Sequence, residues 1–242
     1  MISDILKKAL RAFGSKMNAS PEAKEVLSKA AEGAATYKDA NRFSSLTGRS
    51  LSDVMADALT EAGTMTEADA RALIPGMLQD GHDRVMYVAD AAQKRVFKEA
   101  GVGLQPAAVE FNAERAESLA EQIRGLIPGG YNPDAAENIR LSLENFIRGV
   151  LDDAIKANAK ACRDLGLRAI VTRDYDDVGL HGGKDPCQWC LARAGTWTYD
   201  EANANDVFSR HKGCGCTITY YTERDTQIQT DWASNTWTKI TP

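Results

Sequence analysis

Hydrophobic residues recur at helical spacing through most of the chain. In residues 2–13 they fall on one face, which predicts a first helix that Gly14 ends. Ser20-Pro21 predicts the start of a second helix, because serine caps free backbone amides and proline is tolerated in the first turn. This alanine-rich helix is expected to end near Gly33.

Two further start signals resemble capping boxes in which aspartate replaces the usual glutamate. Ser50-x-x-Asp53 predicts a third helix that runs to Gly63, and Thr66-x-x-Asp69 predicts a fourth. Each pattern lets a hydroxyl and a carboxylate satisfy backbone amides that a helix start leaves without partners.

Proline and glycine punctuate the stretch that follows. Pro75-Gly76 predicts a break or kink in the fourth helix, because proline lacks the amide donor. An apolar stripe over residues 85–96 predicts a helix that ends at Gly101, and another helix is expected from about Pro106 to Ile127. We interpret these apolar faces as core.

The longest predicted helix starts at Asn132-Pro133 and runs to Leu165. A short turn joins it to the helix before, so the two are expected to pack as a long antiparallel hairpin. Cys162 lies on its apolar stripe and is interpreted as a small buried hydrophobe, not an activated nucleophile. The stripe consists of Ile139, Leu143, Phe146, Ile147, Val150, Leu151, Ala154, Ile155, Ala161, Cys162 and Leu165.

The pattern changes after Gly166. Three short runs rich in β-branched and aromatic residues predict strands, namely LRAIVTR, TWTY and CTITYYT. The sequence therefore predicts a mainly α fold in two parts. Residues 1–165 form a helical body, and residues 166–242 form a small α+β module with a polar tail.

The composition is that of an ordinary folded protein, with 43% hydrophobic and 26% charged residues. No run of about 18 apolar residues occurs, so no membrane span is expected. The N-terminus lacks the uninterrupted apolar core of a signal peptide, which favours reduced thiols and metal binding over disulfides. A formal net charge of −5 gives no global attraction to nucleic acid, so any DNA contact has to be local.

Four of the five cysteines gather in the C-terminal part, as Cys187-x-x-Cys190 and Cys214-x-Cys216, with His211 three residues before Cys214. Two thiols spaced by two residues can bind one metal ion, and a second pair about twenty residues on can close a tetrahedral site. This spacing is typical of structural zinc. We expect Cys187, Cys190 and Cys214 to bind zinc, with His211 or Cys216 as the fourth ligand.

Catalytic uses of these residues find no support in the rest of the sequence. Pro186-Cys187-x-x-Cys190 matches half of the zinc deaminase signature, but the His-x-Glu half is missing, because His181 precedes two glycines and His82 precedes Asp83. A His-Asn-His type nuclease needs histidines beyond a structural site, and the chain has three. Because no phosphate-binding glycine loop occurs either, we expect no enzymatic activity.

Basic and aromatic residues accompany the cysteines. We interpret the basic cluster as a solvated rim or as charge balance for the thiolates, in preference to DNA binding. The tryptophans are expected in the core of the small module, although the last two could anchor a partner surface. The basic residues are Lys184, Arg193, Arg210, His211 and Lys212, and the tryptophans are Trp189, Trp197, Trp232 and Trp237.

A helix hairpin, an Arg-x-x-x-Thr-Arg segment, Cys-x-x-Cys, a glycine and His-x-x-Cys-x-Cys follow one another over residues 130–221. In this order they resemble the minor head (head morphogenesis) proteins of tailed phages, the family named after the F protein of phage Mu. The chain departs from the family pattern at Asp174, where glutamate is frequent, and near Arg210, where a proline is frequent. The matching residues are Arg168, Thr172, Arg173, Asp185, Cys187, Cys190, Gly195, His211, Cys214 and Cys216.

The resemblance implies a non-enzymatic virion protein inside the capsid, present in few copies near the portal, and in the host cytoplasm during assembly. It would act in head assembly and in DNA packaging or ejection. Its expected partners are the portal protein, the major capsid protein or both, with self-association and local contact with packaged DNA as further options. No membrane and no small-molecule substrate are expected. The alternative is a zinc-containing nucleic-acid-processing enzyme, nuclease-like, or a DNA-binding module.

Overall fold

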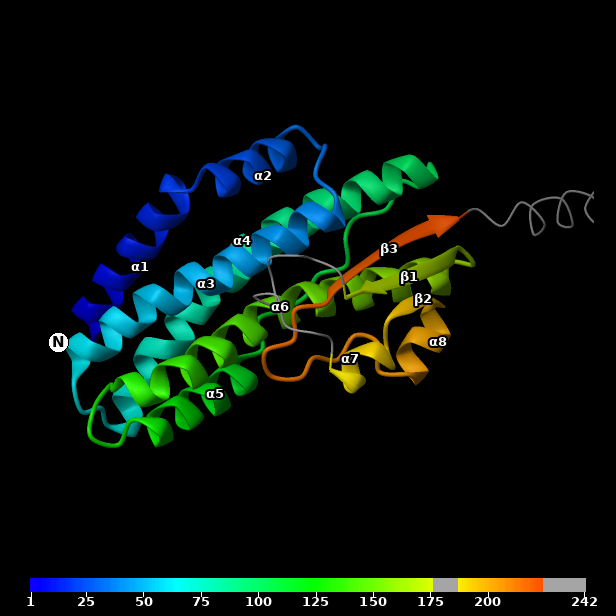
Figure 1. Cartoon of the computed structure of the whole chain (residues 1–242). Helices are drawn as coiled ribbons and strands as arrows, with labels where there is room; N and C mark the ends of the chain where they lie inside the picture. Colours follow the sequence, from blue (N-terminus) through cyan, green and yellow to red (C-terminus); the bar gives the residue numbers. More distant parts are fainter. Residues whose placement is uncertain (176–186, 224–242) are drawn as a thin grey trace, which may run out of the picture.

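The computed structural model describes residues 1–175 and 187–223, which form a helical bundle with a small sheet beside it (Figure 1). The predicted fold class, mainly α with a small α+β part at the C-terminal side, is confirmed. The elements are α1 (Ile2–Ala19), α2 (Pro21–Ala31), α3 (Tyr37–Ala62), α4 (Glu67–Ala100), α5 (Ala113–Leu126), α6 (Pro133–Asp164), β1 (Arg168–Asp174), α7 (Gln188–Leu191), β2 (Gly195–Thr198), α8 (Tyr199–Ala204) and β3 (Thr217–Glu223).

The first helix continues past its predicted end. α1 includes Gly14 and reaches Ala19, because Phe13 and Met17 extend its buried stripe by another turn. One interior glycine costs only about 1 kcal/mol, which such burial outweighs. The second helix begins as predicted, with the Ser20 hydroxyl accepting a hydrogen bond from the amide of Ala23.

The predicted start of the third helix is wrong. Ser50 lies inside α3 and is buried, so its hydroxyl caps nothing. α3 begins at Tyr37 instead, where Thr36 and Asp39 form a reciprocal capping box. The whole stretch from Tyr37 is therefore one helix of 26 residues.

The fourth helix starts at the predicted Thr66–Asp69 capping box but does not break at Pro75. α4 continues through the proline because its neighbours Ile74 and Met77 are fully buried in the core. At 34 residues it is also longer than α6, which has 32 and was predicted to be the longest.

The hairpin of α5 and α6 is present, but α5 begins later than predicted. Residues 101–112 are irregular, and the amide of Ala107 donates to Asn158 of α6 instead of starting a helix at Pro106. Asn112 caps α5, accepting a hydrogen bond from the amide of Arg115 at 2.8 Å. α5 lies beside α6 and also packs against α4 (Figure 1).

All three predicted strands form, and they make an antiparallel sheet in the order β2-β1-β3. Val171 of β1 stands opposite Trp197 of β2 and Tyr220 of β3. The outer edge of β3 meets α3, where the Asn41 side chain donates to the carbonyl of Ile218 at 2.7 Å and accepts from its amide at 3.3 Å.

The sheet and the helices share one hydrophobic core. Val171, Ile218 and Tyr220 belong to the same buried cluster as the inner faces of the helices. The Tyr220 hydroxyl lies next to Cys162 of α6, which is fully buried as predicted. The division of the chain at residue 166 into a helical body and a small C-terminal module stays a prediction.

None of the helices in the described ranges combines the length and apolar character that crossing a membrane requires. Lys184 and His181 of the sequence motifs, and Trp232 and Trp237 of the tail, lie outside the described residues.

Candidate metal centre

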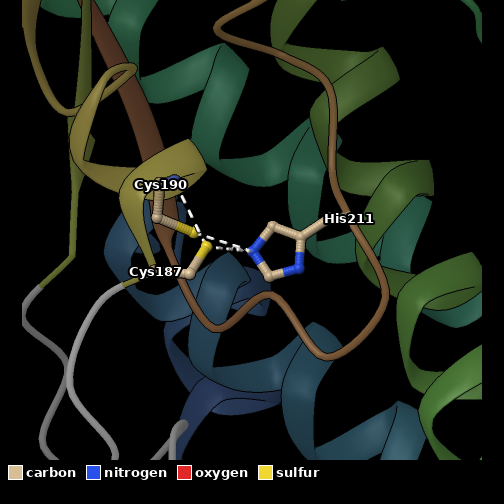
Figure 2. Close-up of side chains that lie close together, drawn as sticks. All are labelled: Cys187, Cys190 and His211. Atoms are coloured by element: carbon tan, nitrogen blue, oxygen red, sulfur yellow. Dashed lines mark hydrogen bonds between the residues drawn. The ribbon is translucent and has the colours of Figure 1, made fainter.

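Two short segments bring the five predicted ligands together. Cys187 caps the single-turn helix α7, which carries Cys190 on its buried side. His211, Cys214 and Cys216 lie on the loop that leads into β3. Figure 2 shows the first three side chains converging from these two segments.

The first triad of the centre consists of Cys187, Cys190 and His211, of which Cys187 is exposed and Cys190 is buried. The Nε2 atom of His211 lies 3.2 Å from Cys187 Sγ and 2.9 Å from Cys190 Sγ (Figure 2). The ligand atoms of this triad all lie within 4.8 Å of one another, which is close enough for a single metal ion to reach all three.

The second triad, which is buried, consists of Cys190, Cys214 and Cys216, whose sulfur atoms also lie within 4.8 Å of one another. Cys190 Sγ and Cys214 Sγ are 3.8 Å apart. A tetrahedral zinc ion with Zn–S bonds of about 2.3 Å would separate two thiolates by about 3.8 Å. Cys190 is thus common to both triads, and the residues present fit a metal ion with thiolate and imidazole ligands.

The ring of His211 is held in the orientation that a ligand needs. Its Nδ1 lies 2.9 Å from the carbonyl oxygen of Lys212, so Nδ1 carries the proton and Nε2 is left to face the thiols. Trp189 of α7 packs edge-on against the ring, with centroids 5.2 Å apart. These contacts fix the imidazole without using the nitrogen that faces the cysteines.

The three buried thiols differ in acidity. A hydrogen bond from Cys216 and the charges of Arg210 and Arg173 lower the pKa of Cys214 to about 3, against the effect of burial. Burial and the neighbouring Cys214 raise the pKa of Cys190 to about 11. The hydrogen bond to Cys214, together with burial, also raises the pKa of Cys216. Of the three buried thiols, Cys214 is therefore the one that loses its proton most easily.

Arg173 of β1 contacts the thiolate directly. Its Nη2 lies 3.2 Å from Cys214 Sγ, and its Nη1 donates to the carbonyl oxygens of Val207 and Ser209, the latter at 2.7 Å. The side chain is completely buried and also lies over the ring of Trp189, 5.0 Å from its centroid. A buried guanidinium needs such partners, and here a thiolate supplies the opposite charge.

Two residues of α6, which belongs to the helical body, hold the loop that leads into β3. Arg148 donates to the carbonyl of Cys214 at 2.6 Å and to the hydroxyl of Ser45 at 2.7 Å. Burial and the neighbouring Arg210 lower the pKa of Arg148 to about 10. Asp152, one turn further on, forms a buried ion pair with Arg210.

The sequence analysis missed Arg148 and Asp152, although a signal for them existed. They lie four residues apart beside the apolar stripe residues Ile147 and Leu151, where a charged pair has no reason to be buried unless it meets a partner. The partner is a loop more than fifty positions away in the chain, which helical periodicity cannot reveal.

The residues of the predicted basic cluster have different surroundings. Arg210 is a buried anchor and not part of a solvated rim, which fits the charge-balance interpretation. Arg193 lies over the ring of Trp189 at 4.0 Å from its centroid, and Lys212 is exposed. Trp189 and Trp197 are half-buried, at the edge of the core and not at its centre.

Comparisons with known proteins identify no relative: no protein-family model, no curated protein and no solved structure matches the chain.

Proposed function

We propose that the chain is a structural protein of a tailed-phage head, a minor component inside the capsid near the portal, with a structural zinc ion at the Cys/His centre. The zinc would fix the loop before β3 and the helix α7 to the helical body. The helices would then offer a rigid surface to portal or major capsid subunits during head assembly and DNA packaging or ejection.

The observation that carries this proposal is how the centre is attached to the rest of the fold. The side chains of Arg148, Arg173 and Arg210 are all buried and connect the Cys214–Cys216 loop to α6 and β1. A metal ion so bound joins segments distant in sequence, which is what structural zinc does. The two triads share Cys190, so an ion held by one triad and completed by a ligand of the other would have four protein ligands and no position for a reacting water, which is the coordination of a structural metal.

Zinc is the metal proposed because of the donor chemistry. Thiolates with one imidazole suit zinc, whereas calcium and magnesium prefer oxygen ligands. We expect the purified protein to contain about one zinc ion per chain, measured by plasma mass spectrometry and by native mass spectrometry. Protein whose only bound metal is iron or none would contradict the zinc assignment.

The structural role is tested by co-expression with candidate portal and major capsid proteins of the same phage, followed by size-exclusion chromatography. We expect a complex with one of them and no turnover of nucleic acid by the purified chain. A metal-dependent nuclease activity that is lost in a folded, zinc-loaded His211→Ala variant would instead favour the zinc-containing nucleic-acid enzyme.

A further inference from the structure

A polar cavity of about 320 Å³ lies between α5 and α6, and Lys212 of the metal-centre loop also lines it. Its size is at the lower end of the range of about 300–1,000 Å³ found for small-molecule sites. Two cations, two hydroxyls, two amides and two apolar side chains line it. The lining residues are Arg115, Ser118, Leu119, Gln122, Ser142, Asn145, Phe146 and Lys212.

Arg115 is held in position at one side of the cavity. Its guanidinium lies over the ring of Phe146, 5.0 Å from the centroid. It also occupies the space above Gly149, where a Cβ atom would come within 2.7 Å of Nη2. Within the described residues its charge is met by Asp153 alone, at 3.7 Å, which is too far for a hydrogen bond. The N–H groups of Arg115 are therefore held in position and can still donate hydrogen bonds to a ligand.

Lys212 approaches from the loop of the metal centre. Its carbonyl oxygen accepts the hydrogen bond from His211, so its backbone is fixed by the same contacts that orient the metal ligand. Its ammonium group donates to Asn138 of α6 at 2.8 Å, which leaves further donors for the cavity. The loop of the metal centre thus positions Lys212, one of the two cations that line the cavity.

The remaining polar groups of the cavity favour an anion. Among the described residues, those that line the cavity include no carboxylate, although the chain as a whole is acidic. The hydroxyls of Ser118 and Ser142 can donate hydrogen bonds to such an anion.

We propose that this cavity binds a phosphate group between Arg115 and Lys212. Phosphate offers several acceptor oxygens and a double charge, which matches a guanidinium, an ammonium and neutral donors around one small volume. The phosphate can come from a free phosphate compound or from the backbone of a DNA duplex. The proposal does not depend on the phage-head function, because it rests on this cavity alone.

The experiment measures binding of the zinc-loaded full chain to two probes. One is a fluorescein-labelled 20-base-pair duplex, followed by anisotropy over a series of salt concentrations, and the other is inorganic phosphate, followed by ³¹P NMR. The test variants are Arg115→Gln and Lys212→Gln. Lys24→Gln, an exposed lysine on α2, is the control with the same change in net charge. Circular dichroism and zinc content verify that each variant is folded and loaded.

Both test variants are expected to weaken binding of whichever probe binds, by roughly tenfold or more, because each removes a charged donor. For the duplex, each should also reduce the salt slope by about 0.9. Binding of the duplex identifies a DNA backbone as the source, and binding of inorganic phosphate alone identifies a small compound. Failure of both probes to bind, or equal effects of the test variants and Lys24→Gln, would overturn the proposal.

A gain of binding provides an independent test. Asp153 is the carboxylate that competes with phosphate for Arg115. Asp153→Asn should therefore tighten binding severalfold more than Asp57→Asn, an exposed change of equal charge on α3. Equal gains in the two variants would mean that only net charge matters, which contradicts a site at Arg115.

Discussion

Arg210 directly precedes the candidate ligand His211 in the chain. Its side chain forms a buried ion pair with Asp152, which lies in the middle of α6. The two side chains are only 4% and 2% exposed, and a second contact joins Arg210 Nη2 to Asp152 Oδ1 at 2.9 Å. Arg210 also donates to the carbonyl of Cys216 at 2.7 Å. Burial alone would lower the pKa of Arg210, but the Asp152 carboxylate raises it, so the guanidinium stays charged.

Breaking this pair should destabilise the fold more than losing any surface ion pair. Arg210→Met or Asp152→Leu is expected to lower the free energy of unfolding by about 3–5 kcal/mol, because each leaves one buried charge without a partner. The double variant should cost less than the sum of the single ones. Urea denaturation measures all three, with Lys160→Ala, which removes an exposed pair with Asp164, as the mild control. Additive effects would contradict direct coupling.

The sharing of Cys190 by both ligand triads makes it the least replaceable ligand. Cys190→Ser is expected to reduce zinc affinity more than His211→Ala or Cys216→Ala, each of which leaves one triad complete. Zinc release to a coloured chelator measures the affinity. Cys162→Ala, which removes the one cysteine outside the centre, should bind zinc like the unaltered protein. Full zinc binding by Cys190→Ser would show that Cys190 is not a ligand, which contradicts a centre built on the shared residue.

Local signals in the sequence correctly located several helix starts and the strands. The Thr66–Asp69 capping box and Asn132-Pro133 start helices where they were predicted, because their hydrogen bonds close within a few residues. The strand runs also appear where they were predicted, because their β-branched and aromatic residues favour extended backbone, although their pairing partners are distant in the chain. Gly14 and Pro75 failed as stop signals because the apolar side chains around them are buried by helices distant in the chain. The Thr36–Asp39 capping box was present in the sequence and was overlooked.

The metal centre likewise has a part that local sequence signals predict and a part that they do not. The spacing of the Cys and His residues was sufficient to identify all five candidate ligands, because two short segments carry them. The residues that hold those segments, Arg148 and Asp152 on α6, could not be paired with the loop from the sequence. Their partners are set by how the sheet packs on the helices, which no periodicity encodes.

A half-buried carboxylate makes stability depend on pH in the helical body. Burial raises the pKa of Asp90, an effect that Lys94 partly offsets. The folded state therefore holds this proton more tightly than the unfolded chain, where the pKa of aspartate is about 3.9. The resulting contribution to stability is fully present below that value and is lost as the pH rises through the folded pKa.

Asp90→Asn removes this ionisation, so the variant should have a higher Tm than the unaltered protein at pH 7 and a similar one near pH 3.5. Thermal unfolding by circular dichroism at the two pH values measures the difference. Asp57→Asn, an exposed substitution with the same change in charge, is the control. A lower Tm for Asp90→Asn at pH 7 would show that the carboxylate is stabilising and would contradict the direction of the shift.

Removal of the metal tests how far the C-terminal part depends on it. A separate zinc-held module over residues 166–242 would melt on chelation while the helical signal persisted. The shared core predicts a narrower effect, because Val171, Ile218 and Tyr220 stay packed against the helices whether or not metal is bound. We expect faster hydrogen exchange in α7 and in residues 210–216, with β1 and β3 protected.

Hydrogen-exchange mass spectrometry before and after treatment with a zinc chelator distinguishes these outcomes. Exchange throughout β1 and β3 with intact helices would support an independent module, and unfolding of the helices as well would contradict both views. The Asn41→Ala variant sharpens the comparison, since it removes the side chain that bonds Ile218 to α3 without touching a metal ligand. If the core and this bond hold β3 in place, chelation should release the strand in Asn41→Ala far more than in the unaltered protein.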